Sequence, residues 1–193
     1  MMKRDAALEV LARKYPDGIV VAVFQSAFDW MVIRPHPLNY LCTGTMGQAA
    51  SHALGLAIGC PEEKVVVLDG DGSLLMNLGA LVTTANAAPK NLVHFICYNG
   101  LYEVNGRFPV PCGHDIDFAG IGKAAGIPHV FNFTDLADLG ARLDEVLSVE
   151  GPVLAVLHVE QGAAHPHDYV ALHSAESRQT FRTALAERRA TAG

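Results

Sequence analysis

Two apolar segments that each end in a polar turn constrain the fold of this chain most strongly. Residues 65–68 form a short β-branched run that stops at a Gly-Asp-Gly turn around Asp71, and residues 91–98 form a longer run that stops at an Asn-Gly turn around Asn99. Such runs are typical of strands buried in a parallel sheet, and a helix expected over residues 73–88 would join them. Because neighbouring parallel strands end at one edge of a sheet, we expect Asp71 and Asn99 to lie close together.

The chemistry of this edge suits a metal ion and a phosphate group. Gly70 and Gly72 permit a tight turn and a close approach of the backbone to a ligand. A helix that opens at Ser73 directs free backbone N–H groups toward an anion. The Asp71 carboxylate and the Asn99 amide oxygen are hard ligands of the kind that Mg²⁺ prefers. From the residues alone, a plain strand–helix–strand turn without a ligand stays open.

The spacing of the two turns resembles the diphosphate- and metal-binding motif of thiamine diphosphate enzymes. In that motif a Gly-Asp-Gly is followed after 26 residues by Asn, as it is here. The resemblance implies that Asp71, Asn99 and the main-chain carbonyl of Leu101 bind Mg²⁺ or Ca²⁺. One departure is Tyr98, where the family usually has Asn or Asp, and it leaves the ligands intact. The residues at this edge that the resemblance assigns to thiamine diphosphate are Gly70, Asp71, Gly72, Ser73, Asn99, Leu101 and Tyr102.

A second segment, residues 43–47, lies between a predicted strand and a predicted helix and resembles the family's Gly-x-Met-Gly loop. The resemblance implies that this loop lies under the two rings of the cofactor. The carbonyl of Gly44 would accept a hydrogen bond from the 4′-amino group, Thr45 would contact the cofactor beside it, and Met46 would bend the cofactor into its V shape. From the residue alone, a place in the core is favoured for Met46, since Met often fills core gaps. Beside the two turns described above, the cofactor role is favoured.

The rest of the chain alternates between strand and helix patterns, which is typical of a parallel α/β sheet. The predicted strands are residues 19–24, 38–42, 65–68, 91–98, 127–131 and 153–159. The predicted helices are residues 5–15, 28–33, 48–58, 73–88, 118–125 (ended by Gly126), 134–148 (capped at Asp135) and a polar terminal helix over 169–189. We therefore expect an α/β fold, a single doubly wound domain over residues 1–193. Its mainly parallel sheet has about six strands flanked by helices, and residues 169–193 form a C-terminal helical extension.

Composition and charge narrow the classes of function. The net charge of −6 and the lack of a Lys/Arg cluster argue against nucleic acid as a partner. No apolar run has the length of a membrane span and the N-terminus does not resemble a signal peptide, so we expect a cytoplasmic protein with no membrane partner. Half of the residues are hydrophobic and 18% are charged, which suggests an apolar surface covered by another chain. The four cysteines are too widely spaced for the clusters of 2-oxoacid:ferredoxin oxidoreductases.

The resemblance also points to a missing part. In the family, the glutamate that activates the cofactor lies on a separate pyrimidine-binding domain of similar size, for which 193 residues leave no room. Glu103 lies next to the metal-binding turn, at the diphosphate end, and is poorly placed for that role. The resemblance thus implies a split enzyme with no catalytic glutamate in this chain. The chain would be inactive alone and would form a dimer or hetero-oligomer with a pyrimidine-binding alpha subunit.

Split enzymes of this layout are found among the sulfopyruvate and phosphonopyruvate decarboxylases, which the chain resembles over residues 41–159. The resemblance implies a beta subunit that takes part in decarboxylating a small 2-oxoacid with an anionic tail. Arg107 and His114 follow the metal-binding turn and could contact that tail, although a solvated loop explains both residues equally well. Residues 104–109 depart from the family's usual Gly-Gly-Gln continuation, which leaves the substrate open.

Two other classes of function stay open. An acetolactate synthase-like carboligase would use the same half-site, and a non-catalytic cofactor-binding module would keep only the fold. The presence of Asp71, Asn99 and Met46 together disfavours the second class. A separate motif, His165 and His167 in a His-x-His-Asp cluster, could bind a metal ion or a carboxylate, or belong to a solvated loop.

Overall fold

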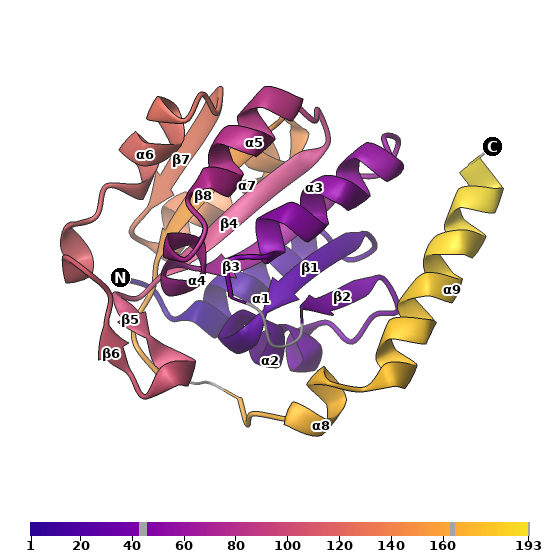
Figure 1. The fold of residues 1–193 in the computed structure, drawn as a ribbon, viewed down its shortest axis with the longest axis horizontal. Helices are drawn as coiled ribbons and strands as arrows, with labels where there is room; N and C mark the ends of the chain where they lie inside the picture. Colours follow the sequence, from indigo (N-terminus) through magenta and orange to yellow (C-terminus); the bar gives the residue numbers. More distant parts are fainter. Residues whose placement is uncertain (43–45, 163–164, 193) are drawn as a thin grey trace.

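Six parallel strands form the central sheet, in the order β2-β1-β3-β4-β8-β7 (Figure 1). The computed structural model describes residues 1–42, 46–162 and 165–192. The strands of the sheet are β1 (Ile19–Val23), β2 (Asn39–Cys42), β3 (Val65–Gly70), β4 (Leu92–Tyr98), β7 (His129–Phe133) and β8 (Val153–His158). The prediction of an α/β fold with a six-stranded parallel sheet is confirmed.

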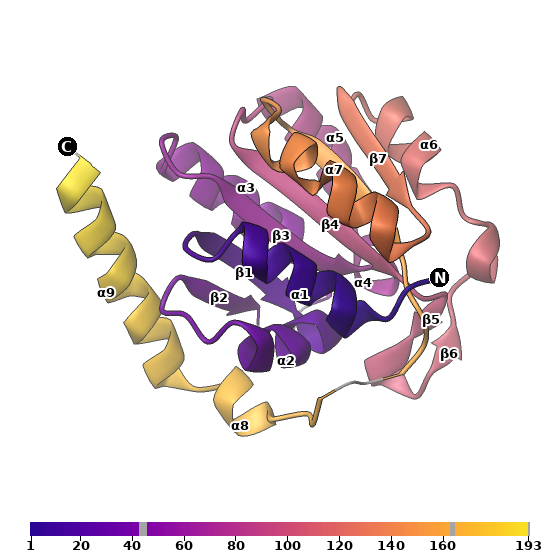
Figure 2. The same cartoon turned by 180° about the vertical axis from the view of Figure 1, so that it is seen from behind.

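Helices cover both faces of the sheet, which makes the fold doubly wound. Figure 2 shows one face, covered by α1 (Arg4–Lys14), α2 (Phe24–Ile33) and α7 (Leu136–Ser148). Figure 1 shows the other face, covered by α3 (Ala49–Gly59), α4 (Asp71–Leu75), α5 (Gly79–Ala87) and α6 (Phe118–Ala124). The strands alternate between these layers: Val66 and Leu68 of β3 belong to the core under α1 and α2, whereas Val65 and Val67 belong to the core under α3. Burial on both faces explains why the strands are mainly apolar.

Two helical segments differ from the sequence prediction. The single helix expected over residues 73–88 is wrong, because α4 ends at Leu75 and α5 begins only at Gly79. Between them the backbone forms tighter bonds, from Asn77 N–H to the Leu74 carbonyl and from Ala80 N–H to the Asn77 carbonyl. The Asn77 side chain also donates to the Gly47 carbonyl at 3.0 Å, which a continuous helix would not place there. The helix expected over residues 28–33 is longer and begins at Phe24 as α2.

A short hairpin follows β4 and was not predicted. It pairs β5 (Leu101–Tyr102) with β6 (Phe108–Pro109) in antiparallel fashion, with a 3₁₀ turn, η1 (Glu103–Asn105), between them. A second 3₁₀ turn, η2 (Gly113–Asp115), leads toward α6. This hairpin carries residues 101–104 over the carboxyl edge of the sheet.

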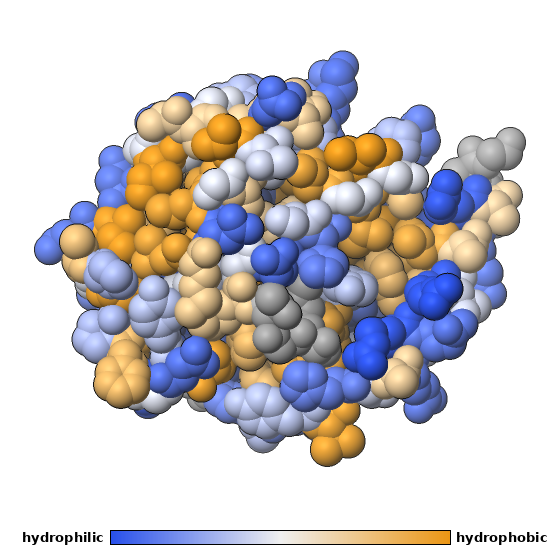
Figure 3. Space-filling model, viewed as in Figure 1, coloured by the Kyte–Doolittle hydropathy of each residue, from blue (hydrophilic) through white to orange (hydrophobic). Residues whose placement is uncertain are grey.

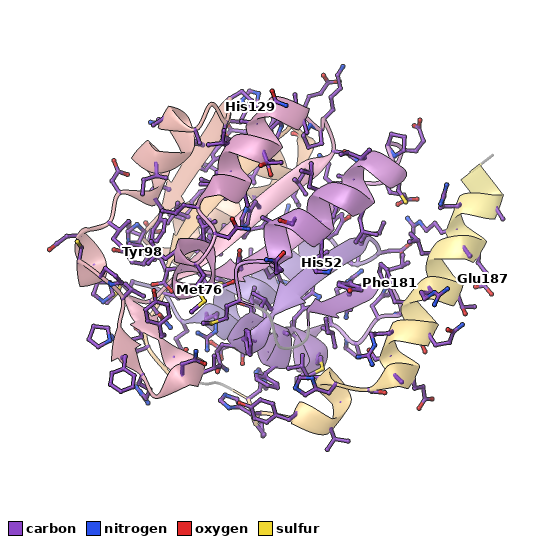
Figure 4. All side chains as sticks on the ribbon, in the orientation of Figure 1. His52, Met76, Tyr98, His129, Phe181 and Glu187 are labelled. Atoms are coloured by element: carbon purple, nitrogen blue, oxygen red, sulfur yellow. The ribbon has the colours of Figure 1, made fainter. Side chains whose placement is uncertain are left out.

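Both ends of the chain pack against the sheet. Met2 forms a parallel bridge with Val159 just beyond β8, with its N–H donating to the His158 carbonyl at 3.0 Å. At the other end, α8 (Tyr169–Leu172) leads into α9 (Ala175–Ala192), which lies along the β2 edge (Figure 1). Phe181 of α9 points at this edge (Figure 4), with its ring centroid 5.3 Å from that of Tyr40. Within the described ranges, no helix combines the length and apolarity that crossing a bilayer requires.

Candidate functional site

The turns that follow β1, β3 and β4 meet at the carboxyl edge of the sheet and enclose a small cavity of about 50 Å³. This is the edge at which parallel α/β sheets bind ligands. The predicted cofactor residues that line it are Met46, Gly70, Asp71, Gly72, Ser73, Asn99, Leu101 and Tyr102. Gly44 and Thr45, also predicted to contact the cofactor, lie outside the described residues. The geometry thus brings together eight residues from three separate segments.

Asp71 is the buried acid of this cavity. It begins α4 and is only 2% exposed. One carboxylate oxygen accepts the N–H of Gly100 at 2.7 Å, and the other accepts the N–H of Gly72 at 2.9 Å. Burial raises the pKa of Asp71 to about 6, although these backbone hydrogen bonds oppose the shift. A carboxylate with this cost of ionisation would be stabilised by a cation in the cavity.

Asn99 faces the same cavity from the end of β4. It is 4% exposed, and its side-chain oxygen accepts the N–H of Leu101 at 2.9 Å. Its side-chain nitrogen donates to the carboxylate of Glu103 at 3.0 Å. The amide is therefore held at both ends, with its oxygen beside the backbone of Leu101.

Close packing explains the glycines of the two turns. A Cβ added to Gly72 would lie 2.5 Å from the Tyr102 ring, which is shorter than any real contact. Gly100 has φ +77°, and a Cβ there would lie 2.9 Å from the His114 ring. Both positions require the smallest residue, so the backbone of each turn can approach its neighbours and a ligand.

The turn that contains Met46 is fastened to the helix after Asp71. The N–H of Gly47 donates to Ser73 Oγ at 3.0 Å, and the carbonyl of Gly47 accepts from Asn77 Nδ2 at 3.0 Å. Gly47 has φ +82°, which favours glycine. These bonds place the half-buried Met46 at the cavity.

The turn after β1 was missed by the sequence analysis and completes the cavity. Phe24 lines it with φ +43°, a strained conformation for a bulky residue. Gln25 also lines it and is 7% exposed; its Oε1 accepts a hydrogen bond from His167 Nε2 at 2.7 Å. Within the described part of the chain, Gln25 Nε2 has no hydrogen-bond partner. The apolar run of β1 was the available signal, because the strand next to β3 must end at the same edge.

A buried ionic network adjoins the cavity, and the sequence analysis did not predict it. Arg4 of α1 is 4% exposed and pairs with Asp29 at 2.7 Å and with Glu103 at 2.9 Å. Its third bond goes to the Gly162 carbonyl at 2.7 Å. His165 Nδ1 lies 3.1 Å from the other oxygen of Asp29. The network therefore ties the first helix and the segment after β8 to the residues beside Asn99.

The remaining candidate residues lie outside this cavity. Arg107 is exposed in the β5–β6 turn, and His114 packs on the Tyr98 ring, so neither lines the cavity. His167 stacks on Phe28 with ring centroids 4.6 Å apart, and His165 pairs with Asp29 as described above. Both histidines thus contact α2. Across residues 1–42, 46–162 and 165–192, no three His, Cys, Asp or Glu side chains are arranged to hold a metal. A metal here would depend on mixed oxygen donors.

Comparisons with known proteins identify the family of this chain. The family described as "Thiamine pyrophosphate enzyme, C-terminal TPP binding domain" matches residues 22–158. Sulfopyruvate decarboxylase subunit beta of Methanothermobacter thermautotrophicus is 37% identical over 168 residues, which cover 85% of each chain. Phosphonopyruvate decarboxylase of Streptomyces viridochromogenes is 36% identical over 162 residues, which cover 83% of this chain and 40% of that protein.

The chain therefore spans about two fifths of the phosphonopyruvate decarboxylase but most of the beta subunit. A solved structure, from a Mycobacterium smegmatis protein described as a thiamin diphosphate-dependent enzyme, superposes with a TM-score of 0.72 at 25% identity. It covers 83% of this chain and 32% of that chain. Because the family matches residues 22–158, more than two thirds of the 193 residues, this chain belongs to the thiamine pyrophosphate enzymes, as a C-terminal TPP-binding domain.

Proposed function

We propose that this chain is the diphosphate- and metal-binding subunit of a split thiamine diphosphate-dependent 2-oxoacid decarboxylase. The observation that carries the proposal is the convergence of Asp71, Asn99 and Met46 on one cavity at the carboxyl edge. The relatives support the reaction class, since the names of two of them are sulfopyruvate decarboxylase subunit beta and phosphonopyruvate decarboxylase. The substrate would be a small 2-oxoacid of the same kind.

The residues present fit the proposed cofactor and metal. Asp71 and Asn99 offer a carboxylate and an amide oxygen, and the carbonyl of Leu101 would supply a third hard donor, a set suited to Mg²⁺ or Ca²⁺. Gln25 Nε2 is a buried donor that lacks an acceptor among the described residues. A diphosphate oxygen in the cavity would satisfy it, and would remove the cost of a buried unpaired N–H group.

The chain's own residues would hold and orient the cofactor. Bound thiamine diphosphate supplies the electron sink for loss of CO₂. Met46 would support its rings, while the two glycine turns and the oxygen donors would fix its diphosphate end. Glu103, the one glutamate among the described residues that line the cavity, is already engaged by Arg4 and Asn99. The activating carboxylate would therefore come from the partner.

The partner in this proposal is a pyrimidine-binding alpha subunit, and the α3–α5 face is the surface it would cover. Figure 3 shows apolar residues gathered on this face of the molecule. Ile58 of α3, Val82 of α5 and Met76 beside α4 are 61%, 58% and 53% exposed. Figure 4 labels Met76 among these side chains. Large apolar side chains left this exposed would lower their free energy by burial against a second subunit.

The test is calorimetric titration of thiamine diphosphate with Mg²⁺ into the chain alone and into its mixture with the alpha subunit. We expect tight, metal-dependent binding in the mixture and its loss in Asp71→Ala, with Asp135→Ala as a matched control in an exposed helix cap. Absence of binding in the mixture would refute the proposal.

Product analysis of the active mixture then separates the two enzyme classes: an aldehyde indicates decarboxylation, and an acyloin indicates a carboligase.

A further inference from the structure

The side-chain amide of Asn99 can serve as a metal ligand in only one of its two orientations. Its oxygen can bind a cation, whereas its NH₂ group cannot, and the two ends have nearly the same size and shape. Nothing in the steric fit of a buried amide therefore selects the productive orientation. The selection must come from the hydrogen-bonding character of its neighbours.

Glu103 supplies that selection. Its carboxylate oxygen Oε2 lies 3.0 Å from Asn99 Nδ2. An ionised carboxylate only accepts hydrogen bonds, so it favours the NH₂ end and would repel the oxygen end. At the other end of the amide, the Leu101 N–H donates to Asn99 Oδ1 at 2.9 Å. This bond favours the same orientation of the Asn99 amide as Glu103 does. One lone pair of Oδ1 is left for a further partner.

Both oxygens of the Glu103 carboxylate accept hydrogen bonds from the surrounding structure. Arg4 Nη1 donates to the same Oε2 at 2.9 Å, and the N–H of Gly162 donates to Oε1 at 2.5 Å. Arg4 is in turn held by Asp29 at 2.7 Å. A charged, hydrogen-bonded and largely buried carboxylate of this kind has little freedom to turn away.

We propose that Glu103 is a positioning residue, which holds the Asn99 amide with its oxygen directed to the metal. This inference rests on the proposed function, because it concerns the same metal site. Because Arg4 and Gly162 hold Glu103, the metal affinity would also depend on α1 and on the segment after β8. Neither of these segments supplies a metal ligand in this proposal. Outer residues that orient ligands usually contribute about 10- to 100-fold to metal affinity.

The test exchanges the roles of the two side chains. In Glu103→Gln the side chain can both donate and accept, so it no longer favours one orientation of the Asn99 amide. In Asn99→Asp two carboxylates face each other and repel. In the double variant Asn99→Asp/Glu103→Gln, the new amide can donate to the new carboxylate, which restores a donor–acceptor pair. The probe is Mn²⁺, whose free concentration is followed by electron paramagnetic resonance in the assembled complex with thiamine diphosphate. Glu150→Gln, at an exposed surface carboxylate, is the matched control.

We expect each single variant to bind Mn²⁺ about 10-fold or more weakly than the wild type. The double variant should bind Mn²⁺ more tightly than either single variant, and the control should bind it as the wild type does. Wild-type affinity in Glu103→Gln, or additive losses in the double variant, would overturn the inference and leave the proposed function intact. No Mn²⁺ binding by the wild-type complex would instead refute the proposed function. If circular dichroism shows that Glu103→Gln does not fold, Glu103→Asp replaces it. This variant keeps the charge for Arg4 but shortens the reach to Asn99, and the same loss is expected.

Discussion

The buried carboxylate of Asp71 should make the stability of the metal-free chain depend on pH in an unusual direction. Its pKa rises from 3.8 to about 6 in the folded state, mainly because burial disfavours the charge. A raised carboxyl pKa contributes stability that is present below the unfolded pKa and is lost as the pH rises through the folded pKa. Most paired carboxylates act in the opposite sense, so this contribution has to be isolated by a variant.

The substitution Asp71→Asn isolates the pH-dependent contribution of Asp71 to stability, because the amide does not titrate. The shift of about two pH units, at about 1.4 kcal/mol each, corresponds to about 3 kcal/mol. The variant loses part of the hydrogen bonding to Gly72 and Gly100, but this cost is the same at every pH. We therefore expect the free energy of unfolding of the wild type, measured relative to the variant, to fall by about 2 kcal/mol between about pH 4 and pH 7.5, because the first part of the loss occurs below pH 4.

Urea denaturation in the presence of EDTA, followed by circular dichroism at several pH values, measures this difference directly. A difference between the two proteins that stays constant across the range would show that burial does not raise the pKa, and would refute the reasoning. A second measurement adds Mg²⁺ and thiamine diphosphate to the assembled complex at neutral pH. We expect these ligands to raise the melting temperature of the wild type but not of the variant, since ligands stabilise only a state that binds them.

Two further substitutions test the packing around the site. Arg4→Met should lower the free energy of unfolding by about 3–5 kcal/mol, because it leaves Asp29 and Glu103 buried without their cation; a loss below about 1 kcal/mol in urea denaturation would contradict this. Gly72→Ala places a Cβ 2.5 Å from the Tyr102 ring, so we expect a loss of about 1–3 kcal/mol from overpacking. Weaker calorimetric binding of the cofactor should accompany it, and unchanged stability would show that the ring moves away freely.

Local patterns predicted the elements of this fold well, because they depend on neighbouring residues. The apolar runs of β3 and β4 identified both strands and the turns after them. The Asp135 cap is confirmed by the bond that its carboxylate accepts from the Asp138 N–H at 2.9 Å. Gly126 ends α6 with φ +95°, as predicted. The break at Asn77 was not predictable in this way, because the side chain bonds to Gly47, far away in the sequence.

The candidate site was predictable where a motif carries it and not where tertiary contacts build it. Asp71 and Asn99 lie on one edge because strand topology brings them there, and the sequence patterns indicated that topology. Arg4 and Glu103 lie 99 positions apart, and nothing in either neighbourhood of the sequence indicates that they pair. The turn at Phe24 could not be expected from its residue type, because a bulky aromatic residue rarely adopts the left-handed conformation that Phe24 has here.

The bridge between Met2 and Val159 gives the beginning of the chain an influence on a site that lies far away in the sequence. The N–H of Met2 donates to the His158 carbonyl and its carbonyl accepts from the Glu160 N–H, which anchors the backbone two residues before Arg4. Proteolytic trimming of these first residues, or a fused tag that pulls them from β8, would withdraw Arg4 from the carboxylates that it neutralises. We therefore expect loss of the backbone bonds between Met2 and residues 158–160 to weaken cofactor binding through Arg4.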